Sequence, residues 1–196
     1  MNRPLVVASG NPGKIREFRE LLAGLPFEVM SQGELGIEGA AETGATFLDN
    51  ALLKARHAAR CSGCAALADD SGLEVDALGG APGVHSARYA GEPADDAANN
   101  AKLVAALAGV PLAARTARYR CVLVLVERAE DPLPRIADAT WEGLIIDAPR
   151  GAGGFGYDAH FWLPQAQLTA AQLSPAEKNR LSHRGAALHA LRRQLE

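Results

Sequence analysis

Apolar residues recur along the chain at two spacings, and the change between them predicts where strands give way to helices. A continuous apolar run at 5–8 is typical of a short strand. From Pro12 to Gly24 the apolar residues recur every three or four positions, which predicts a helix with Asn11 as its N-cap. The chain is therefore expected to open with a strand, a small loop and a helix.

A second helix is predicted from Thr46 to about Arg60, because Thr46 and Asp49 stand at the spacing of a capping box. Its inner face is expected to carry Phe47, Ala51, Ala55 and Ala58. An apolar run at 64–69 then predicts a short buried strand that ends in a turn at Ser71-Gly72, and a further strand is expected at 73–78.

In the second half of the chain, three strands are predicted between two helical segments. The predicted elements are a helix at 95–107, strands at 117–127 and 136–146, a strand at 160–163, and a helix from Pro175 that either continues to Leu195 or restarts at Ser182. The two long strands are expected to be antiparallel neighbours. With no repeat or linker, the pattern predicts one α/β domain over residues 1–196 with a mixed sheet, whose β-rich middle could form a lobe of its own.

Composition and charge narrow the classes of protein that fit. The 196 residues are 48% hydrophobic and 22% charged, which is ordinary for a globular protein with a sizeable core. A formal charge of −3 argues against a nucleic-acid partner, so an anionic ligand would need a local basic pocket or a metal. The longest strongly apolar run has six residues, and the N-terminal run is too short for a signal peptide. We therefore expect no membrane partner and a cytoplasmic location.

Three cysteines fit a reducing compartment better than a disulfide framework. Cys61 and Cys64 have the spacing of a redox or zinc pair, but the chain has no second pair, and Cys64 stands at the start of a predicted buried strand. We interpret them as buried structural thiols.

The loop from Ser9 to Lys14 is a first candidate for phosphate binding. Gly10 and Gly13 let backbone amides approach an anion, the following helix directs its positive end toward the loop, and Lys14 adds a full charge. The spacing is not that of a Walker A loop. A capped helix start that binds nothing explains the same residues, and this segment alone does not decide between the two interpretations.

Asp69 and Asp70 end the apolar run at 64–69, where buried carboxylates need a positive partner. Mg²⁺ is commonly held by one or two carboxylates together with substrate phosphates and water. Glu42, in the loop before the second helix, would form such a pair with Asp70 if the fold brings them together. The alternative is a turn rich in Asp and Ser that faces water.

Polar residues on the second helix have two interpretations as well. Asn50, Lys54 and His57 share one face, which is either the solvated side of the helix or a face from which Lys54 reaches a phosphate. The remaining histidines, His85, His160 and His189, show no metal-ligand spacing and are interpreted as structural.

A glycine-rich run at 153–158 places two aromatic rings and an acid in a flexible loop. The rings of Phe155 and Tyr157 suit either a stacking platform for a nucleobase or a plug for the core. Near the end of the chain, Lys178, His183 and Arg184 offer hydrogen-bond donors, unless they lie on a solvated helix.

Taken together, these segments resemble the inosine/xanthosine triphosphate pyrophosphatase family, which hydrolyses deaminated purine nucleoside triphosphates to the monophosphate and pyrophosphate. The matching stretches, from residue 9 to residue 184, are Ser9-Gly-Asn-Pro-Gly-Lys14, Glu42-Thr-Gly-Ala-Thr-Phe with Asn50-Ala-Leu-Leu-Lys54, Asp69-Asp-Ser-Gly-Leu73, Pro82-Gly-Val-His-Ser-Ala-Arg-Tyr89, Gly154-Phe-Gly-Tyr-Asp158, and Lys178 with Ser182-His-Arg184. They occur in the family's order, and their joint occurrence is highly specific.

The resemblance implies one elongated α/β domain with two lobes around an active-site cleft, usually paired as a homodimer. By position, Glu42 and Asp70 would bind Mg²⁺, and Asp70 would also act as the base for the attacking water. The nucleoside triphosphate would contact Ser9, Gly10, Asn11, Pro12, Gly13, Lys14, Ser71, Phe155, Gly156, Tyr157, Asp158, Lys178, His183 and Arg184. His85 and Ala159 depart from the family's usual Tyr and Pro, but neither is assigned to chemistry.

The implied function is hydrolysis of ITP, dITP and XTP, which would cleanse the nucleotide pool and keep these bases out of DNA and RNA. Donors on His183 and Arg184 would favour a 6-oxo base over the 6-amino group of adenine. One alternative is a pyrophosphatase of the same architecture that prefers other bases, such as modified pyrimidines. Another is a nucleotide-binding regulator without turnover, which is expected to lack Asp70 or Glu42, and this chain has both.

Overall fold

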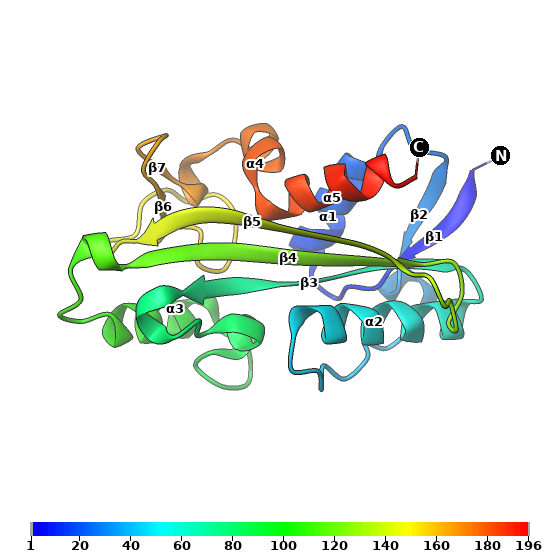
Figure 1. Cartoon of the computed structure of the whole chain (residues 1–196), viewed down its shortest axis with the longest axis horizontal. Coiled ribbons are helices and arrows are strands. Elements are labelled where there is room, and N and C mark those ends of the chain that lie inside the picture. The colour runs from blue at the N-terminus through cyan, green and yellow to red at the C-terminus, as the bar shows by residue number, and fades with distance from the viewer. Residues whose placement is uncertain (1, 196) are drawn as a thin grey trace. The chain divides into compact units, whose positions relative to one another are not determined.

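Seven strands form one mixed β-sheet in the computed structural model, which describes residues 2–195 (Figure 1). The strands are β1 (Arg3–Val7), β2 (Phe27–Ser31), β3 (Ala65–Val75), β4 (Thr116–Val126), β5 (Arg135–Ile145), β6 (Phe161–Leu163) and β7 (Leu168–Thr169). Their spatial order is β2-β1-β3-β4-β5-β6-β7. β1 pairs in parallel with β2 and β3, whereas β6 pairs antiparallel with β5 and β7. The predicted α/β class with a mixed sheet is confirmed.

The helices of residues 2–195 lie between consecutive strands or follow the last strand. The α-helices are α1 (Pro12–Leu22), α2 (Phe47–Ser62), α3 (Asp96–Ala106), α4 (Pro175–Leu181) and α5 (His183–Arg193). Thr46 and Ser174 form capping boxes at the starts of α2 and α4, as their spacing predicts. Ser182 is extended, with φ −73° and ψ 158°, so the C-terminal helix restarts after it instead of continuing. No helix within residues 2–195 combines the length and apolar character needed to cross a membrane.

The described chain divides into two compact units. Unit 1 comprises residues 2–70, 121–139 and 187–195, and unit 2 comprises residues 71–120 and 140–186. β3, β4 and β5 each contribute residues to both units, and the boundary in β3 falls between Asp70 and Ser71. The β-rich middle of the chain is thus divided between the units and does not form a lobe of its own.

Each unit has its own apolar core. In unit 1 the core joins β1, α1, β3 and β4 through fully buried side chains such as Leu5, Phe18 and Leu67. The predicted inner face of α2 is buried as expected. In unit 2 the core gathers Leu73, Leu103 and the aromatic rings of β4 and β6. These cores hold in place the strand ends and loops that carry the polar groups described below.

The turn predicted at Ser71-Gly72 is wrong. β3 runs without a break from Ala65 to Val75, Gly72 is buried, and the Leu73 amide donates to Ser86 Oγ at 2.8 Å. Pairing within the sheet has therefore overridden the local turn preference of a Ser-Gly pair. β2 and β7 were not predicted, because each is short, with five and two residues.

The interpretation of Cys61 and Cys64 as buried thiols is also wrong. Cys61 is exposed in the last turn of α2 and Cys64 is half-buried, whereas Cys121 in β4 is buried. Between the first two, Gly63 adopts the left-handed conformation that ends the helix, with φ 70°, and β3 begins only at Ala65. Cys61 therefore belongs to the end of α2 and Cys64 to the connection that follows, and neither lies in the sheet.

Candidate functional site

Two carboxylates converge on one ammonium group in unit 1. Lys54 Nζ, from α2, lies 2.8 Å from Glu42 Oε1 and 2.9 Å from Asp70 Oδ1. Asn50, one turn earlier on α2, donates from Nδ2 to Asp70 Oδ2 at 3.2 Å and accepts from the Gly44 amide at 2.7 Å. The structure thus brings Glu42 and Asp70 to the same point, as the proposed pairing requires.

Gly44 is required by this close approach of the loop to α2. A Cβ at position 44 would lie 2.7 Å from Asn50 Oδ1 and 2.9 Å from the Asn50 amide nitrogen. Asn50 is buried and the Lys54 side chain is only 12% exposed. The solvated interpretation of this helix face is therefore wrong for both residues, whereas His57 is half-buried and contacts the Glu38 carbonyl.

The electrostatics of Asp70 and Lys54 follow from their burial and their pairing. Burial raises the pKa of the Asp70 carboxyl, and the neighbouring Lys54 ammonium opposes that rise without cancelling it. Burial acting alone would lower the pKa of Lys54, but the charges of Asp69, Asp70 and Glu42 outweigh it and raise the pKa. Lys54 therefore stays charged in the company of these acids.

Asp69, which precedes Asp70 in β3, is paired with a different lysine. Lys14 Nζ, at the start of α1, lies 2.8 Å from Asp69 Oδ2, and the Asp69 side chain is 1% exposed. Because β3 continues through both acids, successive side chains leave the strand on opposite faces. The water-facing interpretation of the Asp69-Asp70 segment is wrong, since each acid is buried against a lysine from another element.

The loop from Ser9 to Lys14 is held together by its own side chains. The amides of Gly13 and Lys14 donate to Asn11 Oδ1 at 2.8 and 3.2 Å, and the Asn11 amide donates to Ser9 Oγ at 3.2 Å. The amides expected to receive a phosphate are thus engaged within the loop, and a bound anion would have to take over some of these hydrogen bonds. Lys14 supplies the charge of this segment through its ammonium group.

The chemistry of the Glu42–Asp70 pair fits a hard divalent cation. Both groups are carboxylates, and both already place an oxygen against one positively charged atom, Lys54 Nζ. Within residues 2–195 no cluster of three or more His, Cys, Asp or Glu side chains is arranged for a metal. A pair of carboxylates without further protein ligands suits Mg²⁺, which keeps water and substrate phosphates as its other ligands, better than zinc or calcium.

A second group of polar residues surrounds the ring of Phe155 in unit 2. Lys178 Nζ lies 4.6 Å from the ring centroid, and the guanidinium carbon of Arg184 lies 5.9 Å from it. Lys178 also forms a buried ion pair with Asp158 at 2.6 Å, and Arg184 donates to Ser71 Oγ at 3.1 Å. The structure therefore gathers Ser71, Phe155, Asp158, Lys178 and Arg184 into one cluster.

The glycine-rich loop holds its two aromatic rings differently. Phe155 is half-buried beside the two cations, whereas Tyr157 is buried and donates from its hydroxyl to the Ser86 carbonyl at 2.7 Å. The Gly156 amide and carbonyl are held by α3, through Asp96 and Asn100. Tyr157 thus plugs the core, and only Phe155 presents a ring to the polar cluster.

One residue of this cluster was not singled out from the sequence. The ring of Tyr119, in β4, stacks on His183 with centroids 4.8 Å apart and planes 9° apart. Its hydroxyl is hydrogen-bonded to Asp158. Tyr119 shares the inward-facing side of β4 with Ala117 and Cys121, so strand alternation could have indicated its burial but not its polar partners.

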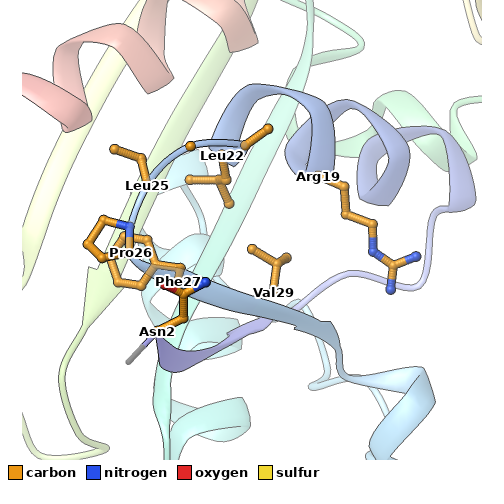
Figure 2. Close-up of a pocket in the computed structure, with 9 residues that line it drawn as sticks. Asn2, Arg19, Leu22, Leu25, Pro26, Phe27 and Val29 are labelled. Atoms are coloured by element: carbon orange, nitrogen blue, oxygen red, sulfur yellow. The ribbon is translucent and has the colours of Figure 1, made fainter.

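A surface hollow beside β2 contains none of these residues. It has a volume of about 530 Å³, and its lining includes Leu22, Leu25, Pro26, Phe27 and Arg19. Figure 2 shows Arg19 apart from Pro26 and Phe27, with aliphatic side chains between them. Arg19 is already paired with Glu34, so the hollow offers no group of titratable residues for chemistry.

Comparison with known proteins identifies close relatives over the full length of the chain. A sequence model of the Ham1 family matches residues 5–194. A dITP/XTP pyrophosphatase of Ralstonia nicotianae is 61% identical, covering 95% of this chain and 93% of the relative. Another from Methylococcus capsulatus is 58% identical, covering 100% and 97%. The solved structure of a HAM1 protein from Coxiella burnetii superposes with a TM-score of 0.92 at 48% identity, covering 100% of this chain and 98% of that one.

Proposed function

Because the chain belongs to the Ham1 family, we propose that it is a nucleoside triphosphate pyrophosphatase acting on deaminated purine nucleotides. It converts ITP, dITP and XTP to the nucleoside monophosphate and pyrophosphate. The observation that carries the proposal is the convergence of Glu42, Lys54 and Asp70 on one point in unit 1. Such a group supplies the carboxylates for a divalent cation and a base for water.

Hydrolysis requires a water molecule to attack the α-phosphorus while pyrophosphate leaves. Asp70 accepts the proton of that water. Because its pKa is raised, its carboxylate is a stronger base than a fully solvated carboxylate. Lys14 and Lys54 stabilise the negative charge that grows on the leaving pyrophosphate. Glu42 and Asp70 are the residues that would hold Mg²⁺, which when bound neutralises polyphosphate charge.

Base recognition is assigned to the residues of unit 2. Phe155 offers a ring face for stacking, and Ser71, Asp158 and Lys178 surround it with polar groups. His183 and Arg184 supply donors that match the 6-oxo group of hypoxanthine and xanthine and leave adenine with unmatched donors. The loop from Ser9 to Lys14 contacts the triphosphate through Lys14 and through amides that a phosphate would take over from Asn11 and Ser9.

The consequence for the cell would be removal of deaminated purines from the cytoplasmic nucleotide pool before they enter DNA or RNA. We further propose that residues 1–196 act as one functional domain, in a homodimer with no nucleic-acid or membrane partner. Light scattering is expected to give twice the chain mass of 20.5 kDa, and a monomer mass would remove the dimer from the proposal.

The decisive experiment is a nucleotide panel with product analysis. The protein is incubated with ITP, XTP, GTP, ATP and modified pyrimidine triphosphates, with Mg²⁺ or with a chelator, and pyrophosphate is measured against orthophosphate. We expect pyrophosphate from ITP and XTP with Mg²⁺ and little from ATP. Turnover of modified pyrimidines alone would move the assignment to another base class, and the absence of any turnover would favour a nucleotide-binding regulator.

A further inference from the structure

Tyr119 is a buried polar residue in the core of unit 2. It lies in β4 with 8% of its surface exposed, among apolar side chains that include Leu103 and Phe161. Its ring contacts Phe161 at a centroid distance of 4.6 Å. A phenylalanine would fill nearly the same space without the cost of burying a hydroxyl, so the hydroxyl calls for an explanation.

The hydroxyl is explained by its two partners in the glycine-rich loop. It donates to the carboxylate of Asp158 and accepts from the backbone amide of Tyr157. Burial, together with the Asp158 charge, holds the pKa of Tyr119 well above its usual 10, so the phenol remains a donor at physiological pH. Asp158 also binds Lys178 at 2.6 Å and the Phe155 amide at 3.0 Å. The hydroxyl of Tyr119 therefore anchors the carboxylate that holds both Phe155 and Lys178.

The ring of Tyr119, in contrast to its hydroxyl, packs against His183. His183 is 5% exposed and lies parallel to the tyrosine ring, 9° apart in plane at 4.8 Å. Trp141 lies beside both rings, 6.4 Å from His183 and 6.5 Å from Tyr119. The stack on Tyr119 favours one plane for the buried imidazole, so the plane in which its ring nitrogens point is set by that contact.

We propose that Tyr119 is a positioning residue for nucleobase selection, which orients His183 through its ring and the Phe155–Asp158–Lys178 group through its hydroxyl. The inference rests on the proposed function, because it concerns how the same cluster distinguishes bases. A donor that can turn accommodates either a 6-oxo or a 6-amino group, whereas a donor held in one plane leaves the wrong base unmatched.

The test separates the ring of Tyr119 from its hydroxyl. Tyr119→Phe keeps the stack on His183 and removes the bond to Asp158, whereas Tyr119→Leu removes both. Tyr89→Phe is the matched control, because Tyr89 packs against the same core and has no assigned role in binding. For each protein, kcat and KM are measured with ITP and with ATP, together with the melting temperature.

For Tyr119→Phe we expect KM for ITP to rise roughly tenfold with kcat nearly unchanged, as for loss of one hydrogen bond to a charged group. The preference for ITP over ATP should fall by the same factor, since ATP makes no use of the oriented donors. Tyr119→Leu should lower the preference further, and Tyr89→Phe should leave it unchanged.

A second measurement does not depend on activity. In NMR spectra, ring protons of His183 stacked on Tyr119 should be shifted upfield in the wild type and in Tyr119→Phe, but not in Tyr119→Leu. A lowered melting temperature with an unchanged ITP preference in both variants would overturn the inference and leave the proposed function intact. A wild-type protein without preference for ITP or XTP would overturn the proposed function and the inference with it.

Discussion

A carboxylate as buried as that of Asp70 would cost several kcal/mol if it were ionised without a partner. Asp70 and Asp69 avoid this cost through Lys54 and Lys14, which approach from α2 and from the start of α1. Each lysine is more than four-fifths shielded from solvent, so the pairs are not ordinary surface salt bridges. These two pairs therefore neutralise buried charge within unit 1.

Asp70→Asn is expected to abolish turnover without unfolding the protein. Loss of a positioned base lowers a rate by about 10²–10⁴-fold, and loss of a metal ligand adds to that. Asparagine can still accept from Asn50, and Lys54 keeps Glu42, so the free energy of unfolding should stay within about 2 kcal/mol of wild type. Pyrophosphate release and thermal unfolding measure the two effects.

The control for this substitution is Asp76→Asn. Asp76 forms an exposed ion pair with Arg118 and has no assigned part in the chemistry, so activity should be unchanged. An Asp70→Asn protein that folds and turns over at a near-normal rate would exclude Asp70 as the base.

The contribution of Glu34 to stability is expected to depend on pH. The Ser31 amide, and then Arg19, lower the pKa of Glu34 from 4.5 to about 2. Since the folded state holds this proton less tightly than the unfolded chain, the stabilisation is present above pH 4.5 and lost as the pH falls toward 2. Glu34→Gln should therefore lower the melting temperature at pH 7, with the difference closing at low pH.

Thermal unfolding at pH 7, 5 and 3 tests this. The control is Glu130→Gln, because Glu130 is 75% exposed and pairs only loosely with Arg60, at 3.2 Å. A Glu34→Gln deficit that is the same at all three pH values would contradict the electrostatic explanation.

At the level of single residues, the sequence indicated candidate side chains for chemistry but not how they pair. Glu42 and Asp70 could be named from their residue types, yet their contact depends on Asn50 and Gly44, which fold the loop against α2. Tyr119 was missed because its partners, Asp158 and His183, are brought to it only by tertiary packing.

At the level of elements, helix starts were predictable because capping depends on residues two or three positions apart. Asn11 and Thr46 cap α1 and α2 as expected. The path of β3 was not predictable in this way. Ser71-Gly72 locally predicts a turn, but β3 continues to Val75 beside β4, beyond its last pairing with β1 at Leu67.

The two interpretations of the loop before α1 can be separated by comparing caps. Asn11 accepts from the amides two and three residues ahead at 2.8 and 3.2 Å, and Asp95 does the same for α3 at 2.8 and 3.1 Å. Asn11→Ala and Asp95→Ala should each cost about 1 kcal/mol of stability. We expect only Asn11→Ala to change KM for ITP, because only Asn11, of the two capping residues, lies in the loop proposed to bind the triphosphate and holds the amides that a phosphate would take over.

Denaturant unfolding and steady-state kinetics measure the two quantities in the same preparations. If both variants lose stability and neither changes KM, the loop from Ser9 to Lys14 is a capped helix start and nothing more.

At the level of the whole molecule, three strands run through both units. β3, β4 and β5 each supply residues to unit 1 and to unit 2. If the strands of one unit unfold, the same strands are therefore disrupted in the other unit. We therefore expect one cooperative unfolding transition, with equal calorimetric and van't Hoff enthalpies.

Two core substitutions test this cooperativity. The substitutions are Leu67→Ala in unit 1 and Leu103→Ala in unit 2. Both leucine side chains are fully buried. Each should cost about 2–5 kcal/mol and shift the same single transition in scanning calorimetry. Two separate transitions, with each substitution moving only one of them, would show that the units unfold independently.

The junction at Asp70 and Ser71 has a consequence for how such proteins diversify. The side chains proposed to carry out hydrolysis and those proposed to recognise the base belong to different units, and the boundary in β3 falls between Asp70 and Ser71. If these roles hold, substitutions confined to unit 2 would redirect the protein toward another nucleobase and leave the proposed base for water unchanged. Libraries randomised around Phe155 and Tyr119 would therefore be the place to search for pyrophosphatases that act on other nucleobases.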